Sequence, residues 1–338
     1  MIDFISKNKL NNNIAIIDDK NISYSYKKIH DDLSIFNFIL EDKGTCFLET
    51  SNHYLPILFF IFCLKNKLVV FLFENLQNFD QLELVNEYKP KYIFSINPIN
   101  KLNYILLFEI DNFFIYKCKI LSKISPHRDI AFLMSTSGTM GNKKFVKISL
   151  KNILINSLQI KDYLKITKKS IAITTLPFNY SYGLSILFSH LISGAKVILN
   201  NDSVISRDFK IKINTYNVTN FGGVPYTYSL LNKINFFDKK FKSLKYVTQA
   251  GGMISDYDKN ILISKSKEFK FSFIIMYGQT EASPRISYLP YKDIIQKHRS
   301  IGIPVKNGKI FIHNKKNKII IKPFIEGELI YQGENVSL

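Results

Sequence analysis

Short apolar runs rich in β-branched and aromatic residues alternate along this chain with longer segments whose apolar residues recur at helical spacing. The strand-like runs are Ile14–Asp18, Thr45–Glu49, Leu68–Phe73, Tyr92–Ser95, Asn103–Phe108, Ile130–Met134, Ser170–Thr174, Lys196–Leu199, Tyr246–Gln249 and Phe271–Met276. The helical segments are Tyr26–Leu40, Tyr54–Lys65, Phe79–Tyr88, Leu150–Leu164, Tyr182–Ile192, Pro225–Lys233 and Ser255–Ser266. Strands separated by helices are typical of α/β proteins. We therefore expect an α/β fold with layered, largely parallel sheets and flanking helices.

The alternation stops after Arg299. Three short strand-like runs then follow one another with no helix between them, at Ile310–His313, Lys318–Ile321 and Gly327–Tyr331. We expect an α/β core over residues 1–299, built from two similar subdomains that meet near residues 170–180. Residues 300–338 are expected to begin a small β subdomain that stops at Leu338 before it closes.

The most apolar segment, Tyr54–Phe73, contains Lys65 and Lys67. A membrane-spanning helix needs about 20 apolar residues with few charges, so this segment predicts a buried helix followed by a buried strand. The N-terminal residues 1–13 lack the apolar core of a signal peptide. The three cysteines are odd in number and widely spaced, which argues against a disulfide framework. We expect a cytoplasmic protein without a membrane span.

The chain carries 46 basic and 27 acidic residues, a formal net charge of +19. Such an excess is a feature of proteins that bind nucleic acids or membrane surfaces. Only four of the basic residues are arginines, and the others are lysines spread along the chain. The dense stretch at residues 315–318 lacks the interleaved aromatic or arginine residues of a base-stacking surface. We expect a solvated basic surface with no nucleic-acid partner, and keep nucleic-acid binding as a hypothesis that depends on charge alone.

One stretch combines hydroxyls, glycines and lysines directly after an apolar run. Residues 134–149 read MSTSGTMGNKKFVKIS. Gly138 and Gly141 allow backbone amides to converge on an anion, while nearby hydroxyls and lysines add donors and charge. These are the components of a polyphosphate site, although the pattern is not that of the common P-loop. Taken alone, the stretch is equally compatible with an exposed polar turn.

Residues 136–146, TSGTMGNKKFV, resemble the signature T-S-G-[ST]-T-G-x-P-K-G-V of the adenylate-forming superfamily. This group includes acyl- and aryl-CoA synthetases, adenylation domains of nonribosomal peptide synthetases, and luciferases. Three positions depart from the pattern, because Met140 replaces threonine, Lys143 replaces proline and Phe145 replaces glycine. We expect Lys143 and Phe145 to restrict a loop that is pliant elsewhere in the family.

Further stretches resemble motifs of the same superfamily and follow in the same order. They are Leu176–Leu184 (LPFNYSYGL), Thr248–Gly252 (TQAGG), Met276–Ala282 (MYGQTEA), Ser300–Pro304 (SIGIP), and Gly327–Ile330 with Gly333–Val336. The resemblance therefore covers nearly the whole chain. It identifies the chain as the N-terminal portion of an adenylate-forming enzyme, which joins a carboxylate to the α-phosphorus of ATP.

The resemblance implies a role for each motif. The loop would hold the β- and γ-phosphates of ATP through Thr136, Ser137, Gly138, Thr139, Gly141 and Lys144. Thr280 would donate to the α-phosphate, where negative charge develops during the reaction. Glu281 would bind Mg²⁺, a cation that prefers carboxylate and phosphate oxygens. The predicted catalytic residues are therefore Thr280, Glu281 and Lys144.

The same resemblance implies the contacts to the adenine and to the acid. Tyr277 would pack on the adenine, next to Gly278 and Gln279, and Gly251 with Gly252 would let the backbone approach the edge of the base. The acid would bind near Tyr180, Tyr182 and Gly183. The implied substrates are an acyl or aryl carboxylic acid and ATP, with CoA or a phosphopantetheine carrier protein as acceptor.

Each of these residues also has an ordinary structural interpretation. Tyr277 could be a core aromatic, and Glu281 could form an ion pair with Arg285 on one face of a helix. The two glycines could form a simple turn, and the tyrosines at positions 180 and 182 could merely line a pocket. His190, on the apolar face of a predicted helix, is interpreted as a core histidine whose hydrogen bonds are satisfied.

The family's T-G-D segment, hinge and C-terminal domain with its catalytic lysine do not occur in these residues. Three hypotheses follow. The chain is an adenylating ligase whose C-terminal domain comes from a separate polypeptide, a catalytically impaired relative that binds nucleotide or acyl ligand without turnover, or a basic nucleic-acid-binding protein.

Overall fold

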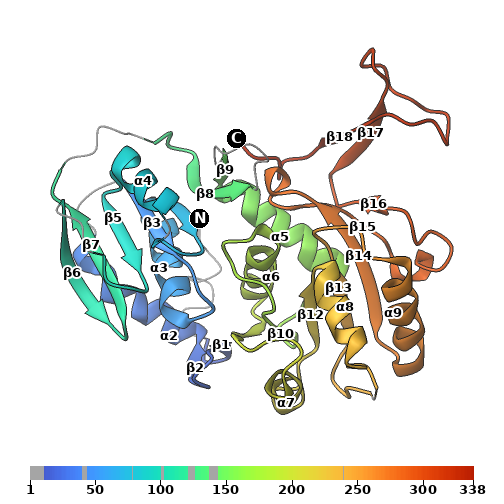
Figure 1. Ribbon diagram of the computed structural model, residues 1–338, viewed down its shortest axis with the longest axis horizontal. Coiled ribbons are helices and arrows are strands. Elements are labelled where there is room, and N and C mark those ends of the chain that lie inside the picture. The colour runs from blue at the N-terminus through green and yellow to red at the C-terminus, as the bar shows by residue number, and fades with distance from the viewer. Residues whose placement is uncertain are drawn as a thin grey trace.

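The computed structural model describes residues 11–39, 44–77, 79–99, 103–120, 126–136, 144–238 and 240–338. Within them the chain forms two large sheets and one separate hairpin (Figure 1). The first sheet contains, in spatial order, β6 (Tyr104–Ile110), β7 (Phe113–Cys118), β5 (Tyr92–Ser95), β3 (Thr45–Glu49), β4 (Val69–Phe73), β8 (Ile130–Thr136) and β9 (Lys144–Ser149). Its central pairs, β5–β3, β3–β4 and β4–β8, are parallel, and its edges are antiparallel.

The second sheet is formed mainly by the later half of the chain. Its strands are, in spatial order, β16 (Ile303–Pro304), β15 (Arg285–Tyr288), β14 (Ser272–Gly278), β13 (Tyr246–Gln249), β12 (Asn220–Gly223), β10 (Ile171–Ile173), β11 (Lys196–Ile198), β1 (Ile14–Ile17) and β2 (Ser23–Ser25). The run from β14 to β1 is parallel throughout. The predicted α/β fold with largely parallel sheets is therefore confirmed.

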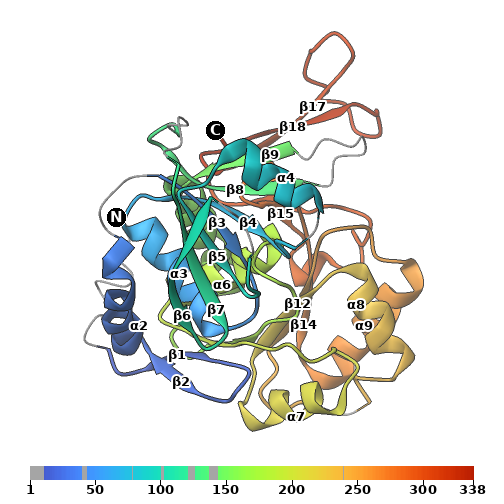
Figure 2. The ribbon, with the colours of Figure 1, turned by 60° about the vertical axis from the view of Figure 1, so that its left-hand side comes forward.

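Helices separate and cover the two sheets in five layers (Figures 1 and 2). Between the sheets lie α2 (Tyr26–Asp32) with the 3₁₀ helix η1 (Leu33–Ile39), α3 (Tyr54–Lys65), α5 (Leu150–Leu164) and α6 (Ser181–Leu191). The outer face of the first sheet packs against α4 (Phe79–Tyr88). The outer face of the second packs against α7 (Arg207–Thr215), α8 (Pro225–Lys233) and α9 (Asp256–Phe269).

Strand alternation distributes the apolar side chains between these layers. Along β3, Cys46 and Leu48 face the central layer, whereas Phe47 points to the outer cluster beneath α4. Successive strand side chains point to opposite faces, so a sheet buried on both faces needs apolar residues at every position. The continuous apolar runs of the sequence are explained by this double burial.

The segment Tyr54–Phe73 forms a buried helix, α3, followed by a buried strand, β4, as predicted. Every residue of α3 except Lys65 is buried, because the helix has apolar neighbours on all sides. No helix in the described part of the chain is long and apolar enough to cross a membrane.

Several sequence-based predictions of secondary structure were wrong or incomplete. Lys318–Ile321 is not a strand, since it contributes one isolated bridge, from Ile319 to His313. The segment predicted as a helix from Tyr26 begins as α2 and continues as η1, and Leu40 lies outside the described residues. The strands β7, β9, β12, β15 and β16 and the helix α7 were not predicted, mostly because they are short or polar.

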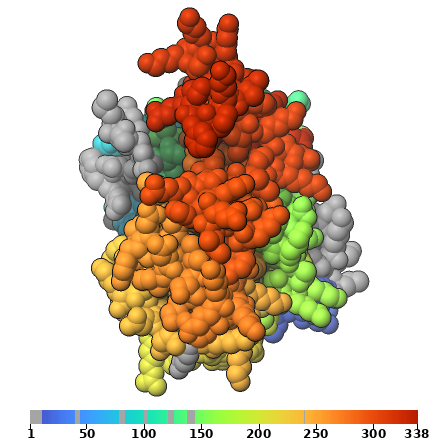
Figure 3. Space-filling view, turned by 90° about the vertical axis from the view of Figure 1, so that its right-hand side faces the viewer, coloured from blue at the N-terminus to red at the C-terminus, as the bar shows by residue number. Residues whose placement is uncertain are grey.

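The two ends of the chain differ from the expected division into a core over residues 1–299 and a β subdomain after it. The strands β1 and β2 join the second sheet beside β11, so the two halves of the core are not strictly sequential. The boundary near residues 170–180 stays a prediction. After β16, the antiparallel strands β17 (Lys309–His313) and β18 (Glu328–Gln332) form a hairpin that projects from the body (Figure 3).

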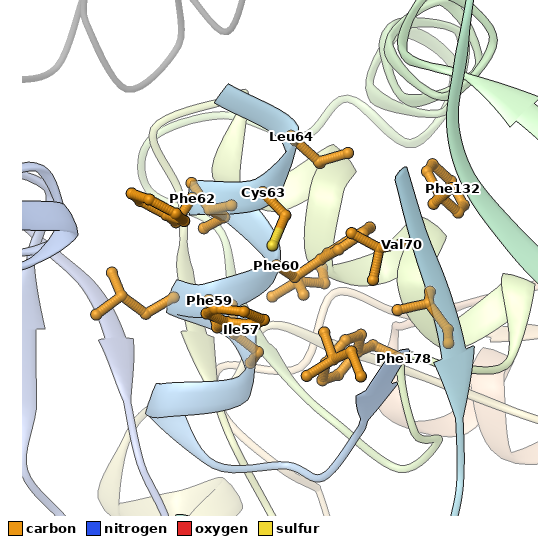
Figure 4. Packing of buried hydrophobic residues seen from close by; sticks show 14 of the residues in the cluster. Ile57, Phe59, Phe60, Phe62, Cys63, Leu64, Val70, Phe132 and Phe178 are labelled. Carbon is orange, nitrogen blue, oxygen red and sulfur yellow. The ribbon is translucent and has the colours of Figure 1, made fainter. Parts of the chain in front are cut away.

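Phe60 on α3 lies in the apolar layer between the two sheets and contacts residues from both halves of the core (Figure 4). Its ring is fully buried, 5.4 Å from Phe132 of β8, 6.0 Å from Phe178 and 5.9 Å from Phe188 of α6. Because these contacts come from both halves of the core, we expect Phe60→Ala to lower the free energy of unfolding by about 3–5 kcal/mol.

Urea unfolding followed by circular dichroism measures this loss. Leu158→Ala, at a helix position that is 53% exposed, is the control, and should change stability by no more than about 0.5 kcal/mol. Equal effects of the two substitutions would contradict the central role of Phe60.

Candidate functional site

The turn after β14 places Thr280 and Glu281 at the carboxyl end of the second sheet. Strand β14 pairs with β15 through a bulge between Tyr277 and Gly278. A Cβ on Gly278 would lie 1.9 Å from the Pro284 carbonyl oxygen, so any other residue would clash with the backbone. The Gln279 amide donates to that same oxygen at 2.9 Å. This close approach starts the 3₁₀ helix η2 (Thr280–Ala282) directly after the strand.

Thr280 meets the first turn of α6. Its Oγ1 lies 3.1 Å from the Oγ of Ser181, the first residue of that helix, and either hydroxyl can donate. The two residues are 99 positions apart in the sequence. The structure thus joins two of the predicted motifs, and the interaction restricts the rotation of the Thr280 hydroxyl.

Tyr180, which precedes α6, reaches the glycine turn that follows β13. A Cβ on Gly251 would lie 2.4 Å from the Tyr180 hydroxyl oxygen, so the tyrosine rests against the glycine backbone. Gly251 has a φ of +83°, which side chains other than glycine rarely adopt. The Gly252 carbonyl accepts a hydrogen bond of 2.8 Å from the Gln249 side chain, and both glycines are exposed. A third motif therefore lies beside the first two.

The structure describes the two ends of the predicted phosphate loop. Thr136 at the end of β8 pairs with Lys144 at the start of β9. The predicted ligands between them, Ser137, Gly138, Thr139 and Gly141, lie outside the described residues together with Met140 and Lys143. Strand β9 packs against η2, so Lys144 begins a strand that lies next to Thr280 and Glu281.

Phe145 anchors one end of that loop to the first sheet. Its ring centroid lies 5.3 Å from that of Phe71, 6.1 Å from Phe73 and 6.4 Å from Tyr88. A glycine at this position could make none of these contacts. They support the expectation that Phe145 restricts the loop.

The final residues bridge η2 and β9, a role that was missed in the sequence. Asn335 is fully buried, and its Nδ2 donates to the carbonyls of Ala282 at 2.6 Å and Arg285 at 3.0 Å. The Ser337 amide donates to the Glu281 carbonyl, and the Leu338 amide to Lys147. The motif at residues 333–336 was recognised, but only the structure shows that its asparagine positions the turn around Thr280.

The Glu281 side chain is available for a ligand. It is exposed, and no described residue forms an ion pair or hydrogen bond with its carboxylate. The alternative ion pair with Arg285 on a helix face is wrong, because Arg285 lies in β15 and is only 2% exposed. A lone exposed carboxylate fits Mg²⁺, which commonly binds one or two carboxylates together with phosphates and water. No group of three or more His, Cys, Asp or Glu suited to a metal occurs among the described residues.

Tyr277 and Gln279 flank Gly278 at the same edge of the sheet. Tyr277 lies in β14 opposite Ser287 and is half-buried, and Gln279 is exposed. Partial exposure at the carboxyl end of a parallel strand, where ligands of such sheets commonly bind, is compatible with packing on an adenine. The predicted contacts of Tyr277, Gly278 and Gln279 with the base stay predictions.

Tyr182 points into the protein rather than toward Thr280. Its hydroxyl donates to the Thr248 carbonyl at 2.9 Å and lies 2.7 Å from the Thr248 hydroxyl. The Arg285 guanidinium lies 4.9 Å from the ring centroid. Gly183 packs on the preceding turn, where a Cβ would be 2.1 Å from the Pro177 carbonyl oxygen. Tyr180 and Tyr182 therefore have different roles, the first beside the glycine turn and the second inside the core.

His190 on α6 is buried, and burial lowers the pKa of its ring from 6.5 to about 4. Its Nδ1 lies 2.8 Å from the Ile186 carbonyl, a hydrogen bond in which the neutral ring donates. Its Nε2 has no hydrogen-bond partner. The interpretation of a satisfied core histidine is therefore correct for one ring nitrogen and wrong for the other.

The lowered pKa of His190 predicts a pH dependence of stability. Between about pH 4 and 6.5 the unfolded chain binds a proton that the folded chain excludes, so stability falls as the pH is lowered through this interval. A difference of this size corresponds to on the order of 3 kcal/mol. Urea unfolding at pH 4.5, 5.5 and 6.5 should show a shallower pH dependence for His190→Gln than for the unchanged chain.

The matched control is the exposed His127, whose replacement by glutamine should leave the pH dependence as it is. If His190→Gln keeps the full slope, another group is responsible for it.

The sequence matches the family model described as AMP-binding enzyme over residues 117–338. Among curated proteins, it is 32% identical over 194 residues to a component of the plipastatin synthase of Bacillus subtilis, a match that covers 55% of this chain and 7% of that one. It is 25% identical over 255 residues to 2-succinylbenzoate–CoA ligase of Staphylococcus epidermidis, covering 71% of this chain and 51% of the ligase. The chain thus spans at most about half the length of these relatives.

The fold is also that of a solved relative. The o-succinylbenzoate CoA synthetase of Bacillus subtilis, in complex with its acyl-adenylate intermediate, superimposes with a TM-score of 0.78 at 20% identity, covering 99% of this chain and 70% of that one. The same synthetase in complex with ATP and magnesium ion gives a TM-score of 0.70. At this identity the likeness shows a shared fold.

Proposed function

This chain belongs to the AMP-binding enzyme family, and from that premise we propose that it binds ATP with Mg²⁺ and adenylates a carboxylic acid. Its relatives are CoA ligases and peptide synthetases. The proposed product is an acyl or aryl adenylate destined for a thioester with CoA or with the phosphopantetheine of a carrier protein. Such a reaction, using free ATP, is proposed to take place in the cytoplasm.

The observation that carries this proposal is the convergence of separate motifs around Thr280. The hydrogen-bonding contact of Thr280 with Ser181 and the contact of Tyr180 with Gly251 bring three of them together. Strand β9, which begins at Lys144, packs against the same turn. If these motifs were only a polar turn and a core tyrosine, there would be no reason for them to lie together.

The chemistry requires two anions, a carboxylate and a triphosphate, to meet. Lys144 supplies positive charge at one side of the turn, and Thr280, oriented by Ser181, supplies a hydroxyl donor at the other. Donors fixed in advance stabilise charge that develops in a transition state more effectively than donors that must reorient. The loop residues Ser137, Gly138, Thr139 and Gly141 are proposed to hold the leaving phosphates.

Mg²⁺ is proposed to bind Glu281 together with the phosphates of ATP. The exposed carboxylate, without a protein partner in the described part of the chain, fits this role. When bound, Mg²⁺ would neutralise phosphate charge and so favour loss of pyrophosphate. The Ser337–Glu281 backbone hydrogen bond holds the turn that carries this carboxylate.

The adenine is proposed to lie between Tyr277 and the exposed turn at Gly251 and Gly252, next to Gly278 and Gln279. The C-terminal domain of the family, with its lysine, is proposed to come from another polypeptide or from a continuation of the chain. The alternative is a relative that binds nucleotide or acyl ligand without turnover. The packing of the Phe145 ring against Phe71, next to the phosphate loop, favours that alternative.

Replacement of Glu281 by glutamine tests the proposed metal site. Glu281→Gln keeps the size of the side chain but removes the charge, so we expect ATP affinity in Mg²⁺ to fall by at least about tenfold, while affinity in EDTA stays unchanged. Isothermal titration calorimetry measures both. Glu326→Gln, another exposed carboxylate, is the control and should bind ATP as the unchanged chain does.

Exchange of labelled pyrophosphate into ATP tests the reaction itself. We expect exchange that depends on a carboxylic acid, in a panel that spans short, long and aromatic acids, when a C-terminal domain from a related ligase is supplied. Thr280→Val, which removes the hydroxyl but keeps the shape, should reduce exchange by about 100-fold. If the chain binds ATP but shows no exchange with any acid under any condition, the adenylation proposal is wrong and the non-catalytic alternative is correct.

A further inference from the structure

A small cavity lies beside Tyr182. It is lined by residues of α5, α6, β12, β13, β14 and β15, among them Tyr182, His190, Asn220, Tyr246 and Arg285. The space that the centre of a water molecule can occupy within it is about 10 Å³, close to what one water needs. Among the described residues assigned to the adenylation chemistry, only Tyr182 lines this cavity.

The cavity is bordered by a buried positive charge. Arg285 is 2% exposed, and no carboxylate in the described part of the chain lies within 4.0 Å of its guanidinium. Its Nε has no hydrogen-bond partner. A buried charge without a counter-charge is strongly unfavourable, so this arrangement indicates that an anion belongs beside it.

The phenol groups nearest to Arg285 cannot supply that counter-charge. Burial raises the pKa of Tyr163 to about 12 although the charge of Arg285 opposes the shift, and burial raises the pKa of Tyr182 as well. Both hydroxyls therefore stay protonated. The face of the Tyr182 ring, 4.9 Å from the guanidinium carbon, provides a favourable cation–π contact but no negative charge.

Two further polar atoms of the cavity lining are unpaired. The Tyr246 hydroxyl and the His190 Nε2 are buried and have no hydrogen-bond partner. The great majority of buried polar atoms in proteins are hydrogen-bonded. Three unpaired atoms around one cavity, two of them potential donors, point to a ligand group that accepts hydrogen bonds.

The cavity is close to the position where the acid would react. Ser181, which contacts Thr280, is followed directly by Tyr182, over which Arg285 lies. In the sheet, Arg285 pairs with Gly278, only two positions before Thr280. Neighbouring residues therefore connect the proposed reaction centre to the buried guanidinium.

We propose that the acid adenylated by this chain carries a second carboxylate, which binds Arg285 and the Tyr246 hydroxyl. The inference rests on the proposed function. A carboxylate accepts from both the Arg285 Nε and the Tyr246 hydroxyl, while a water can donate to His190 Nε2. The cavity has room for about one water, so binding of a carboxylate requires the Tyr182 ring to shift. Ser181, beside Thr280, and Tyr182, beneath the Arg285 guanidinium, are consecutive residues of α6, so the proposed substrate class is a short dicarboxylic acid.

Matched pairs of acids test this inference by calorimetry on the full chain, with and without a non-hydrolysable ATP analogue and Mg²⁺. Succinate and butyrate have the same number of carbons and differ by a carboxylate in place of a methyl group. We expect succinate to bind at least about tenfold more tightly than butyrate. Arg285→Met should remove this preference, and Lys240→Met, at an exposed lysine, should retain it. Equal binding of the two acids, or no binding of either, overturns the inference.

Tyr246→Phe provides a second test that does not depend on the folding of the Arg285 variant. It removes only the unpaired hydroxyl and should weaken succinate about threefold, with butyrate unchanged; unchanged succinate binding overturns the inference. Sulfate that competes as well as succinate itself would show an adventitious anion site only, and also overturns it. A chain that prefers succinate through Arg285 but binds no nucleotide supports the dicarboxylate site and contradicts the proposed adenylation.

Discussion

The apolar layer between the two sheets determines where the other parts of the molecule lie. Helix α3 is buried on every side, and Phe60 contacts rings from β8, the segment before α6, and α6 itself. Burial of this much apolar surface favours one spacing of the sheets. The first turn of α6 is thereby held opposite the carboxyl ends of β13 and β14, which is where the site is formed.

Polar contacts then fix the exact positions of the elements that the apolar layer brings together. The backbone of Arg285 is the centre of these contacts, because its amide donates to Asn156 and its carbonyl accepts from Asn156 and Asn335. These bonds connect α5, β15 and the C-terminal segment. The side chain of the same residue extends over Tyr182 into the cavity. A single residue therefore couples the turn that carries Thr280 and Glu281 to the cavity proposed to select the acid.

The sequence predicted the strongly apolar elements well. Helix α3 and strands β3 and β5 were predicted with their observed bounds. Each is mainly apolar and is buried on all sides, so its local composition marks it clearly. Short edge strands such as β15 and β16 were missed, and Lys318–Ile321 was wrongly predicted to be a strand. Pairing of such segments depends on neighbours that are distant in the sequence, so local composition contains little information about it.

The sequence by itself determined the chemistry that is available: the order of the motifs, the hydroxyls and carboxylate at Thr280 and Glu281, and the family resemblance that the family match bears out. Only the tertiary structure decided which residues meet. It paired Thr280 with Ser181, separated Arg285 from Glu281, and enclosed Arg285 with His190 and Tyr246 around one cavity. The reason is physical, since burial and the loss of a hydrogen-bond partner are properties of the packed chain. A sequence motif specifies residue types, whereas the environment of each side chain depends on every element packed around it.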